Sequence, residues 1–210
     1  MKYTPLYFVG RRLLPWFFRI VMPIRVRNAD AMPQNGKIIL CSNHASMTDP
    51  VRLAFAQSRQ IFYMAKSELF QNRFVGAVIR GLGAFPVSRG TGDKQAVGNA
   101  LALLKKENVL GIFIEGTRSK DGNLLRPKSG AVMLAHACGA PILPCCITAK
   151  DGRPPRLFHT CIISFARPIP PEDLCIEKGT PSEYRRASRM VMEQIAKLRE
   201  QNLQEFGNKL

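Results

Sequence analysis

Short apolar runs alternate with amphipathic segments along most of the chain. Runs rich in β-branched and aromatic residues predict strands at 37–42, 60–65, 84–88, 109–114, 142–147 and 160–166. The segments between and after them predict helices at 50–57, 72–81, 93–107, 129–138 and 182–205. This alternation indicates an α/β sandwich with a mixed, mostly parallel sheet flanked by helices. In such sheets the functional groups gather in loops beyond the strand ends.

The first thirty residues follow a different pattern, so we divide the chain into an N-terminal helical segment, 1–30, and a single domain, 31–210. Thr4-Pro5 is typical of a helix start, and Pro15 is expected to kink or split the helix. One face of this helix carries Leu6, Leu13, Phe17 and Ile20, and the opposite face carries Arg11, Arg12 and Arg19. Either the helix lies in a bilayer interface, which we favour, or it packs on the core with a solvated basic face.

The charge of the chain points to an anionic partner. Its 210 residues include 31 Lys and Arg against 15 Asp and Glu, a net charge of +16. A nucleic acid, an acidic membrane or a phosphorylated substrate would each fit this charge. No run reaches the ~20 apolar residues of a transmembrane helix, and arginines interrupt the N-terminal apolar stretch. We therefore expect neither a membrane span nor a cleavable signal peptide.

The six cysteines predict neither disulfides nor a metal site. No pair has Cys-x-x-Cys spacing, and several lie in apolar runs. Free cysteine in such runs behaves as a small hydrophobe. We expect buried, reduced thiols in a cytosolic protein, with no metal and no cofactor.

His44 and Asp49, in the segment CSNHASMTDP, are the first candidates for chemistry. The segment follows a predicted strand and leads into a helix that begins at Asp49-Pro50. Histidine accepts a proton near neutral pH, and a carboxylate bonded to one ring nitrogen leaves the other nitrogen to act as a base. The pair also fits a plainer interpretation, in which Asp49 caps the helix and His44 is a loop residue. The two roles of Asp49 need not exclude each other, because a carboxylate has two oxygens.

Three loops that follow predicted strands or precede a predicted helix are basic. Their notable residues are Arg89 in GAFPVSRG (83–90), Glu115, Gly116, Thr117 and Arg118 in FIEGTRSKDG (113–122), and Arg126 and Lys128 in RPKSG (126–130). Glycine lets a ligand approach the backbone, arginine presents a fork that matches phosphate oxygens, and a helix start favours anions. Each loop alone is typical of a solvated surface, but three together indicate an anion site.

Taken together, these segments resemble the glycerolipid acyltransferases, typified by 1-acyl-glycerol-3-phosphate (lysophosphatidate) acyltransferase. NHASMTD (43–49) looks like the NHx4D signature of that family. Further blocks follow in the family's order: AKSEL (65–69), GAFPVSR (83–89), EGTRS (115–119) and APILP (140–144). The resemblance spans roughly residues 35 to 170. The sequence departs from the family at Ile114, where a proline often precedes the glutamate.

The resemblance implies direct transfer of a fatty acyl group from acyl-CoA or acyl-carrier protein to the sn-2 hydroxyl of lysophosphatidate, making phosphatidate for phospholipid biosynthesis. His44 would be the general base and Asp49 would orient it. The acceptor's glycerol-phosphate part would contact Lys66, Arg89, Glu115, Gly116, Thr117 and Arg118, with Asn43 and Lys128 as further candidates. The block 140–144 would shape the acyl or acceptor pocket.

The implied setting is the cytoplasmic face of the cell membrane, where a peripheral protein would meet an anionic surface through its basic amphipathic helix. Within the same family, glycerol-3-phosphate, a lyso-phospholipid or an acylated amino acid stays open as the acceptor.

Two other classes of protein fit the sequence less well. A nucleic-acid-binding module would carry aromatic–basic strand motifs or a helix-turn-helix, and the sequence shows neither. A serine hydrolase would carry Gly-x-Ser-x-Gly, which is absent, and Cys41 lies inside a predicted strand. We therefore expect an enzyme that binds no nucleic acid.

Overall fold

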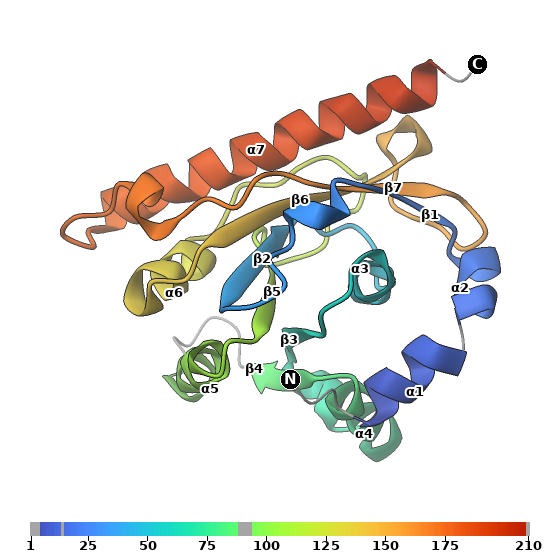
Figure 1. Ribbon diagram of the computed structural model, residues 1–210, viewed down its shortest axis with the longest axis horizontal. Helices are drawn as coiled ribbons and strands as arrows, with labels where there is room; N and C mark the ends of the chain where they lie inside the picture. The colour runs from blue at the N-terminus through green and yellow to red at the C-terminus, as the bar shows by residue number, and fades with distance from the viewer. Residues whose placement is uncertain (1–4, 14, 88–93, 209–210) are drawn as a thin grey trace.

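The computed structural model describes residues 5–13, 15–87 and 94–208 (Figure 1). Its strands form one seven-stranded sheet in the order β1-β7-β6-β2-β5-β3-β4. They are β1 (Ile24–Arg27), β2 (Ile38–Ser42), β3 (Ile61–Lys66), β4 (Ala84–Val87), β5 (Val109–Phe113), β6 (Ile142–Ala149) and β7 (Cys161–Phe165). The predicted strands are confirmed to within two residues at each end, and β1 is an addition.

The predicted helices are confirmed as well. The helices of the domain are α3 (Asp49–Ala56), α4 (Arg73–Gly81), α5 (Lys94–Lys105), α6 (Gly130–Cys138) and α7 (Pro181–Gly207). Short 3-10 helices are η1 (Ala29–Ala31), η2 (Ser67–Phe70), η3 (Lys150–Gly152) and η4 (Pro171–Leu174). The long α7 begins with a capping box, because the Thr180 side chain accepts from the Glu183 N–H and the Glu183 carboxylate accepts from the Thr180 N–H.

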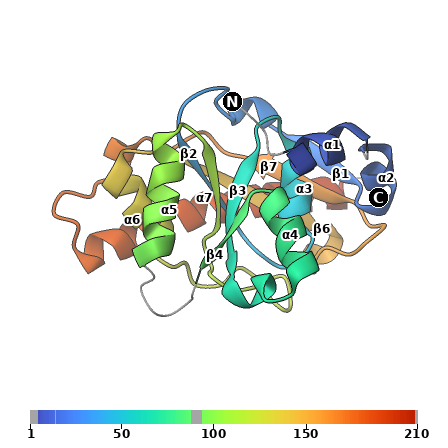
Figure 2. The same cartoon turned by 90° about the horizontal axis from the view of Figure 1, so that it is seen from below.

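Five neighbouring strands of the sheet point the same way. β2 pairs in parallel with β5 and β6, and β3 pairs in parallel with β4 and β5. β7 runs antiparallel to β6, and β1 lies parallel to β7. The sheet is therefore mixed and mostly parallel, as the alternation of strands and helices predicted. The carboxyl ends of β2, β3, β5 and β6 meet at one edge, which we call the carboxyl edge (Figure 2).

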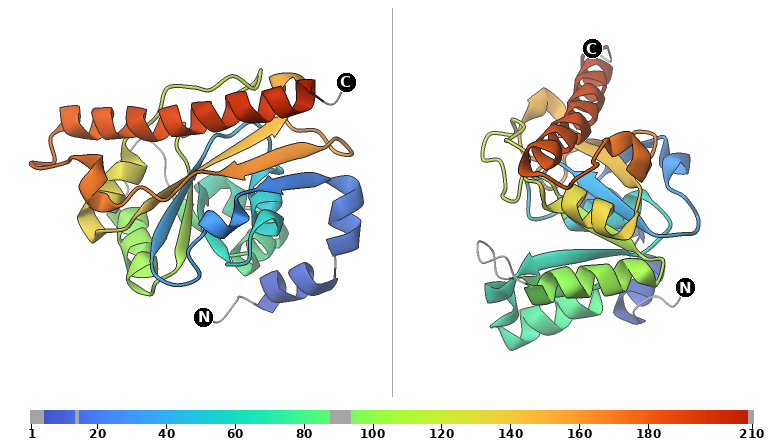
Figure 3. Two further views of the ribbon diagram at one scale, coloured as in Figure 1. Left: turned by 45° about the horizontal axis from the view of Figure 1, so that its top comes forward. Right: turned by 90° about the vertical axis from the view of Figure 1, so that its left-hand side faces the viewer.

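Each face of the sheet has its own apolar core. Helices α5, α6 and α7 cover one face, where Leu104 and Val191 share a core with Ile39. On the other face Leu53 of α3 packs in a core with Leu40. Neighbouring residues of β2 thus point to opposite, equally buried faces, which explains why the strands read as unbroken apolar runs. Figure 3 shows α7 along one side of the molecule and the N-terminal helices along the other.

The N-terminal segment forms an arm of two helices, α1 (Pro5–Leu13) and α2 (Pro15–Val21), beside α3 and α4 (Figure 1). Residue 14, between the two helices, lies outside the described residues, as does Thr4, so the kink or split at Pro15 and the helix start at Thr4-Pro5 stay predictions. The buried hydroxyl of Tyr7 donates to the carbonyls of Ala54 and Arg59, at 3.3 and 3.4 Å.

The helical arm is shorter than predicted and ends at Val21 rather than at residue 30. Residues 24–27 form β1, which pairs with β7. The reason is tertiary: four residues with alternating half-buried and exposed side chains become a strand only because an edge of the sheet is there to pair with them.

The cysteines behave as the apolar runs predicted. Cys41, Cys145, Cys146 and Cys161 are buried and free, while Cys175 is exposed. Burial raises the pKa of the Cys146 thiol to about 12 and that of Cys161 to about 11. These thiols stay protonated near neutral pH and contribute to the core as small hydrophobes.

Candidate active site

His44 and Asp49 form a hydrogen-bonded pair at the carboxyl edge. β2 ends at Ser42, and the turn after it folds back so that Asp49, the first residue of α3, reaches the imidazole. The distance from His44 Nδ1 to Asp49 Oδ2 is 2.8 Å, with the Asp49 side chain 1% exposed and the His44 side chain 12% exposed. A carboxylate on Nδ1 fixes the tautomer and leaves Nε2 as the basic nitrogen. The structure thus brings the predicted pair together.

Asp49 does not cap α3. Its Oδ2 accepts from the backbone N–H groups of Ala45 and Ser46, at 2.8 and 2.7 Å, and both belong to the preceding turn. The plainer interpretation of Asp49 as the cap of α3 is therefore wrong, because Thr48 occupies the N-cap position and the donors to Asp49 Oδ2 come from the turn. Three donors converge on one oxygen, and they hold the carboxylate and the imidazole in one orientation.

The imidazole of His44 lies flat on the ring of Phe113. The ring centroids are 3.9 Å apart and the planes differ by 16°. Tyr63 of β3 continues the stack behind Phe113, with centroids 5.8 Å apart. An aromatic pair adds about 0.5–1.5 kcal/mol beyond its buried area. In the sequence, both rings are marked only by their position in two predicted strands, 60–65 and 109–114.

Asn43 ties the turn to β6. Its side-chain oxygen accepts from the Ile147 N–H at 2.8 Å, and its amide donates to the Ile147 carbonyl at 2.9 Å. Asn43 is 4% exposed. Both ends of its amide are therefore committed to the neighbouring strand, where they fix the start of the turn that carries His44.

Glu115, two residues after the end of β5, lies against the backbone of the same turn. Its side chain is 2% exposed, and its Oε1 accepts from the His44 N–H at 3.3 Å. Burial raises the pKa of this carboxyl to about 7, while hydrogen bonds from the His44 and Leu125 backbone oppose the rise. Oε2 is buried without a hydrogen-bond partner among the residues that the structure describes. Glu115 therefore supports the backbone of His44 and changes charge near neutral pH.

The residues after Glu115 fold against the turn, so that the backbone of the predicted basic loop contacts the backbone of His44. The Ser119 N–H donates to the His44 carbonyl at 2.8 Å. Gly116 has a φ of +72°, and a Cβ there would lie 3.2 Å from Cγ of Lys128. Thr117 and Arg118 are exposed, as is Lys128. A hydroxyl and two cations therefore stand at the surface of the loop whose backbone contacts His44.

Ile114, the departure from the family pattern, takes part in strand pairing. Its N–H donates to the Ser42 carbonyl at 3.0 Å, and its carbonyl accepts from the Lys128 N–H at 2.8 Å. A proline has no N–H and would lose the first of these bonds. The isoleucine therefore ties the exit of β5 to the end of β2.

The remaining predicted residues lie farther from the pair or outside the described chain. Lys66, at the end of β3, is exposed and pairs with Glu68, with Nζ 2.8 Å from Oε1. Arg89 lies outside the described residues. The block 140–144 leads into β6 at the end opposite the carboxyl edge, and its Ile142 and Leu143 fill the two cores of the sheet.

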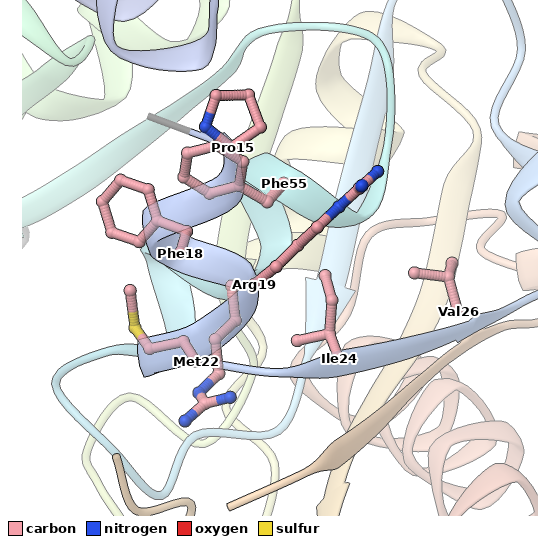
Figure 4. Close-up of a pocket in the computed structure, with 8 residues that line it drawn as sticks. Pro15, Phe18, Arg19, Met22, Ile24, Val26 and Phe55 are labelled. Carbon is pink, nitrogen blue, oxygen red and sulfur yellow. The ribbon is translucent and has the colours of Figure 1, made fainter. Parts of the chain in front are cut away.

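Arg52, a buried arginine to which the sequence analysis gave no role, links α3 to two neighbouring segments. It is 1% exposed, and its guanidinium donates to the carbonyls of Pro23 and Arg156, at 3.4 and 2.8 Å. It also lines a cavity of about 350 Å³ between α2, β1 and α3 (Figure 4). The cavity wall is mostly apolar, with Phe18 and Phe55 facing it, and it includes neither His44 nor Asp49.

Fold and site together define a class: an α/β protein with a hydrogen-bonded histidine–carboxylate pair at the carboxyl edge of its sheet and exposed cations in the adjoining loop. The chain belongs to the Acyltransferase family, whose sequence profile matches residues 23–148. The match begins just before β1 and ends within β6, so it contains the whole of the histidine turn and the loop after β5.

Curated relatives carry one recurring name. The chain is 34% identical over 122 residues to the 1-acyl-sn-glycerol-3-phosphate acyltransferase of Bacillus subtilis, covering 58% of this chain and 60% of that protein. It is 37% identical over 120 residues to the protein of the same name from Streptococcus pneumoniae, covering 56% and 44%. The matched segment thus spans about half the length of these relatives.

A solved structure has the same fold. It is the crystal structure of the 1-acyl-sn-glycerophosphate (LPA) acyltransferase PlsC from Thermotoga maritima, with a TM-score of 0.67 and 24% sequence identity. The superposition covers 92% of this chain and 78% of that chain. Within the described residues of the present protein, no helix combines the length and the apolar character needed to cross a bilayer.

Proposed function

We propose that the protein is a 1-acylglycerol-3-phosphate O-acyltransferase, which moves a fatty acyl group from a thioester to the sn-2 hydroxyl of lysophosphatidate and makes phosphatidate. The observation that carries the proposal is the 2.8 Å bond between His44 Nδ1 and Asp49 Oδ2 in a chain of the Acyltransferase family. The names of its relatives support lysophosphatidate as the acceptor.

In the proposed reaction, His44 Nε2 takes the proton of the acceptor hydroxyl as the hydroxyl oxygen attacks the thioester carbonyl carbon. A C–O bond forms and the carbonyl oxygen becomes an oxyanion, whose collapse breaks the C–S bond. The imidazolium then gives its proton to the leaving thiolate, so the products are an ester and a free thiol. Asp49 stabilises the imidazolium throughout. General-base help of this kind supplies ~10²–10⁴-fold in rate.

The exposed cations beside His44 would hold the phosphate of the acceptor. Arg118 presents a planar fork that matches two phosphate oxygens, and Lys128 adds a second charge from the same loop. Lys66, at the end of β3, and Arg89, which follows β4 in the sequence, would contribute further charge. Glu115, which is buried against the His44 backbone, would act by supporting the turn.

Because the acceptor is a lipid, the proposal includes docking of the arm on the cytoplasmic face of the membrane. The predicted apolar face of the arm is open: Leu13 is 64% exposed and Ile20 is 60% exposed. No residue of α2 is fully buried, and Arg12 and Arg19 are exposed beside these apolar side chains. Each cation near an anionic surface contributes ~1 kcal/mol to binding. The arrangement favours an interfacial helix over one that only packs on the core.

A radiolabelled transfer assay tests the proposal. Purified protein would be mixed with anionic lipid vesicles, lysophosphatidate and either labelled oleoyl-CoA or labelled acyl-carrier protein. We expect labelled phosphatidate with at least one donor. In parallel reactions with glycerol-3-phosphate, a lyso-phospholipid or an acylated amino acid, a labelled product formed only there would identify that compound as the acceptor in place of lysophosphatidate. Absence of any labelled product with both donors would contradict the transferase function.

A further inference from the structure

The most exposed large apolar side chains of the described residues come from four separate segments. They are Phe74 of α4 (79% exposed), Met47 of the histidine turn (69%), Trp16 of α2 (67%) and Phe158 of the loop between η3 and β7 (65%). Leaving such side chains in water forgoes the free energy of their burial. Single exposed apolar residues are ordinary on a protein surface, but a set gathered round one site indicates a partner.

Three of these four side chains lie at the carboxyl edge, round His44. Met47 is inside the turn between His44 and Asp49. Phe74 is the second residue of α4, which follows β3 and η2, on one side of β2. Phe158 lies in the connection from β6 to β7, on the other side of β2. Ala149 at the end of β6 pairs with Cys161 at the start of β7, so this connection lies at the carboxyl edge.

The backbone holds Phe158 in an uncommon conformation. Its φ is +61°, in the left-handed region that aromatic residues rarely adopt. Its N–H donates to the carbonyl of Val21, the last residue of α2, at 2.7 Å. The neighbouring Arg156 carbonyl is held by the buried Arg52. The fold therefore fixes this loop to the end of the arm while the phenyl ring stays outside.

The same surface continues from the arm to α4. α1 packs against α4, where the side chain of Leu6 lies against Gly81 and leaves no room for a Cβ. Phe74 lies at the opposite end of α4, which is strongly amphipathic and has Val75 40% exposed. The arm thus meets the loop of Phe158 at Val21, and it meets α4 at the end away from Phe74.

Cations surround this apolar set. Exposed arginines lie on each contributing segment: Arg12 on α1, Arg19 on α2, Arg73 and Arg80 on α4, and Arg153 and Arg156 in the loop that carries Phe158. Apolar side chains ringed by arginines fit the boundary of an anionic lipid leaflet, where rings enter the acyl region and guanidinium groups meet lipid phosphates.

We propose that Phe74 and Phe158 insert into an anionic phospholipid leaflet on the two sides of His44, so that membrane contact reaches from the arm to the carboxyl edge. This inference extends the proposed function, because a lipid acceptor would then pass from the leaflet to His44 without crossing water. The occupant of the surface is the bilayer itself, and no soluble protein is required.

Vesicle binding without a donor tests the inference, since it needs no turnover. The protein would be sedimented with vesicles of phosphatidylcholine and phosphatidylglycerol as wild type, Phe74→Ser and Phe158→Ser. Matched controls are Val97→Ser on α5 and Met133→Ser on α6, which remove exposed apolar side chains (45% and 48%) from the opposite face of the sheet. Each variant would be checked for folding by circular dichroism.

We expect each phenylalanine variant to bind vesicles roughly tenfold more weakly, because a ring that enters the leaflet gains the transfer free energy of one apolar side chain. The controls should match wild type. In a Trp16→Phe background, the tryptophan of Phe74→Trp or of Phe158→Trp should shift its fluorescence emission to the blue when vesicles are added. Wild-type binding by both phenylalanine variants would confine membrane contact to the arm and overturn the inference.

A second copy of the chain is the competing occupant. Sedimentation velocity without lipid distinguishes it, and we expect the same monomeric boundary for wild type, Phe74→Ser and Phe158→Ser. A wild-type dimer that either substitution dissociates would assign the surface to self-association and overturn the inference. Because none of these measurements involves acyl transfer, failure of the inference and failure of the proposed function are separate results.

Discussion

The turn from Ser42 to Asp49 and the loop from Gly116 to Lys128 touch at the same edge of the sheet, yet the fold treats them differently. In the turn, buried hydrogen bonds fix Asn43, His44 and Asp49 in single orientations. In the loop, the backbone is held by Ser119, but the side chains of Thr117 and Arg118 are left at the surface. Under the proposed function, the turn holds the general base in place and the loop binds the charged acceptor. Substitutions in the first should lower the rate, and those in the second should lower the affinity.

Removal of the base should have the largest effect. We expect His44→Ala to lose at least ~10²-fold in kcat, as loss of a general base does. Transfer from labelled oleoyl-CoA to lysophosphatidate would measure it, and circular dichroism would show that the variant is folded. The exposed His136 of α6, substituted by Ala, is the matched control and should keep wild-type activity. Activity of His44→Ala within a few-fold of wild type would remove the pair from the mechanism.

Removal of the charge behind the base should come next. Asp49→Asn keeps the size of the side chain but no longer stabilises the imidazolium or fixes its tautomer, so we expect kcat to fall by roughly 10²-fold. The KM for the acceptor should change little, since Asp49 is 1% exposed and out of reach of a ligand. Steady-state kinetics over a range of lysophosphatidate concentrations separates the two constants. A rise in KM with kcat preserved would place Asp49 in binding instead.

A substitution in the loop should show the opposite pattern. We expect Arg118→Ala to raise the KM for lysophosphatidate about tenfold with kcat largely kept, because the charge-assisted bonds to phosphate are lost. Arg118→Lys should recover only part of the affinity for lysophosphatidate, since an ammonium group lacks the planar fork. Lys105→Ala, an exposed cation at the far end of α5, serves as the control. An unchanged KM in Arg118→Ala would locate the phosphate elsewhere.

The smallest effect should come from Glu115, where the turn and the loop meet. Burial raises its pKa from 4.5 to about 7, so the folded chain binds this proton more tightly than the unfolded chain does. Its contribution to stability is present at low pH and is lost as the pH rises through about 7. Between pH 4.5 and about 7, we expect the free energy of unfolding of wild type to fall more than that of Glu115→Gln.

Urea unfolding at a series of pH values measures the difference, with Glu193→Gln on the exposed side of α7 as the control. Parallel curves for wild type and Glu115→Gln would show that Glu115 keeps an ordinary pKa. Transfer activity of Glu115→Gln would show in parallel whether the turn needs the charge or only the hydrogen bond to His44.

Much of this protein was determined by local sequence. The order of strands and helices followed from apolar runs and turn residues, because a sheet buried on both faces needs continuous apolar strands. The pairing of His44 with Asp49 was also predictable, since the residues are five apart and one turn can join them.

Tertiary structure alone decided the rest, because it depends on segments that are distant in the sequence. β1 is a strand only beside β7, and Phe113 supports His44 only because β5 lies next to β2. Glu115 has a raised pKa only because the turn buries it, and Phe74 and Phe158 flank one site only because of the strand order. Local pattern specifies which elements form, whereas burial and neighbours, which set energies and charges, arise when the sheet assembles.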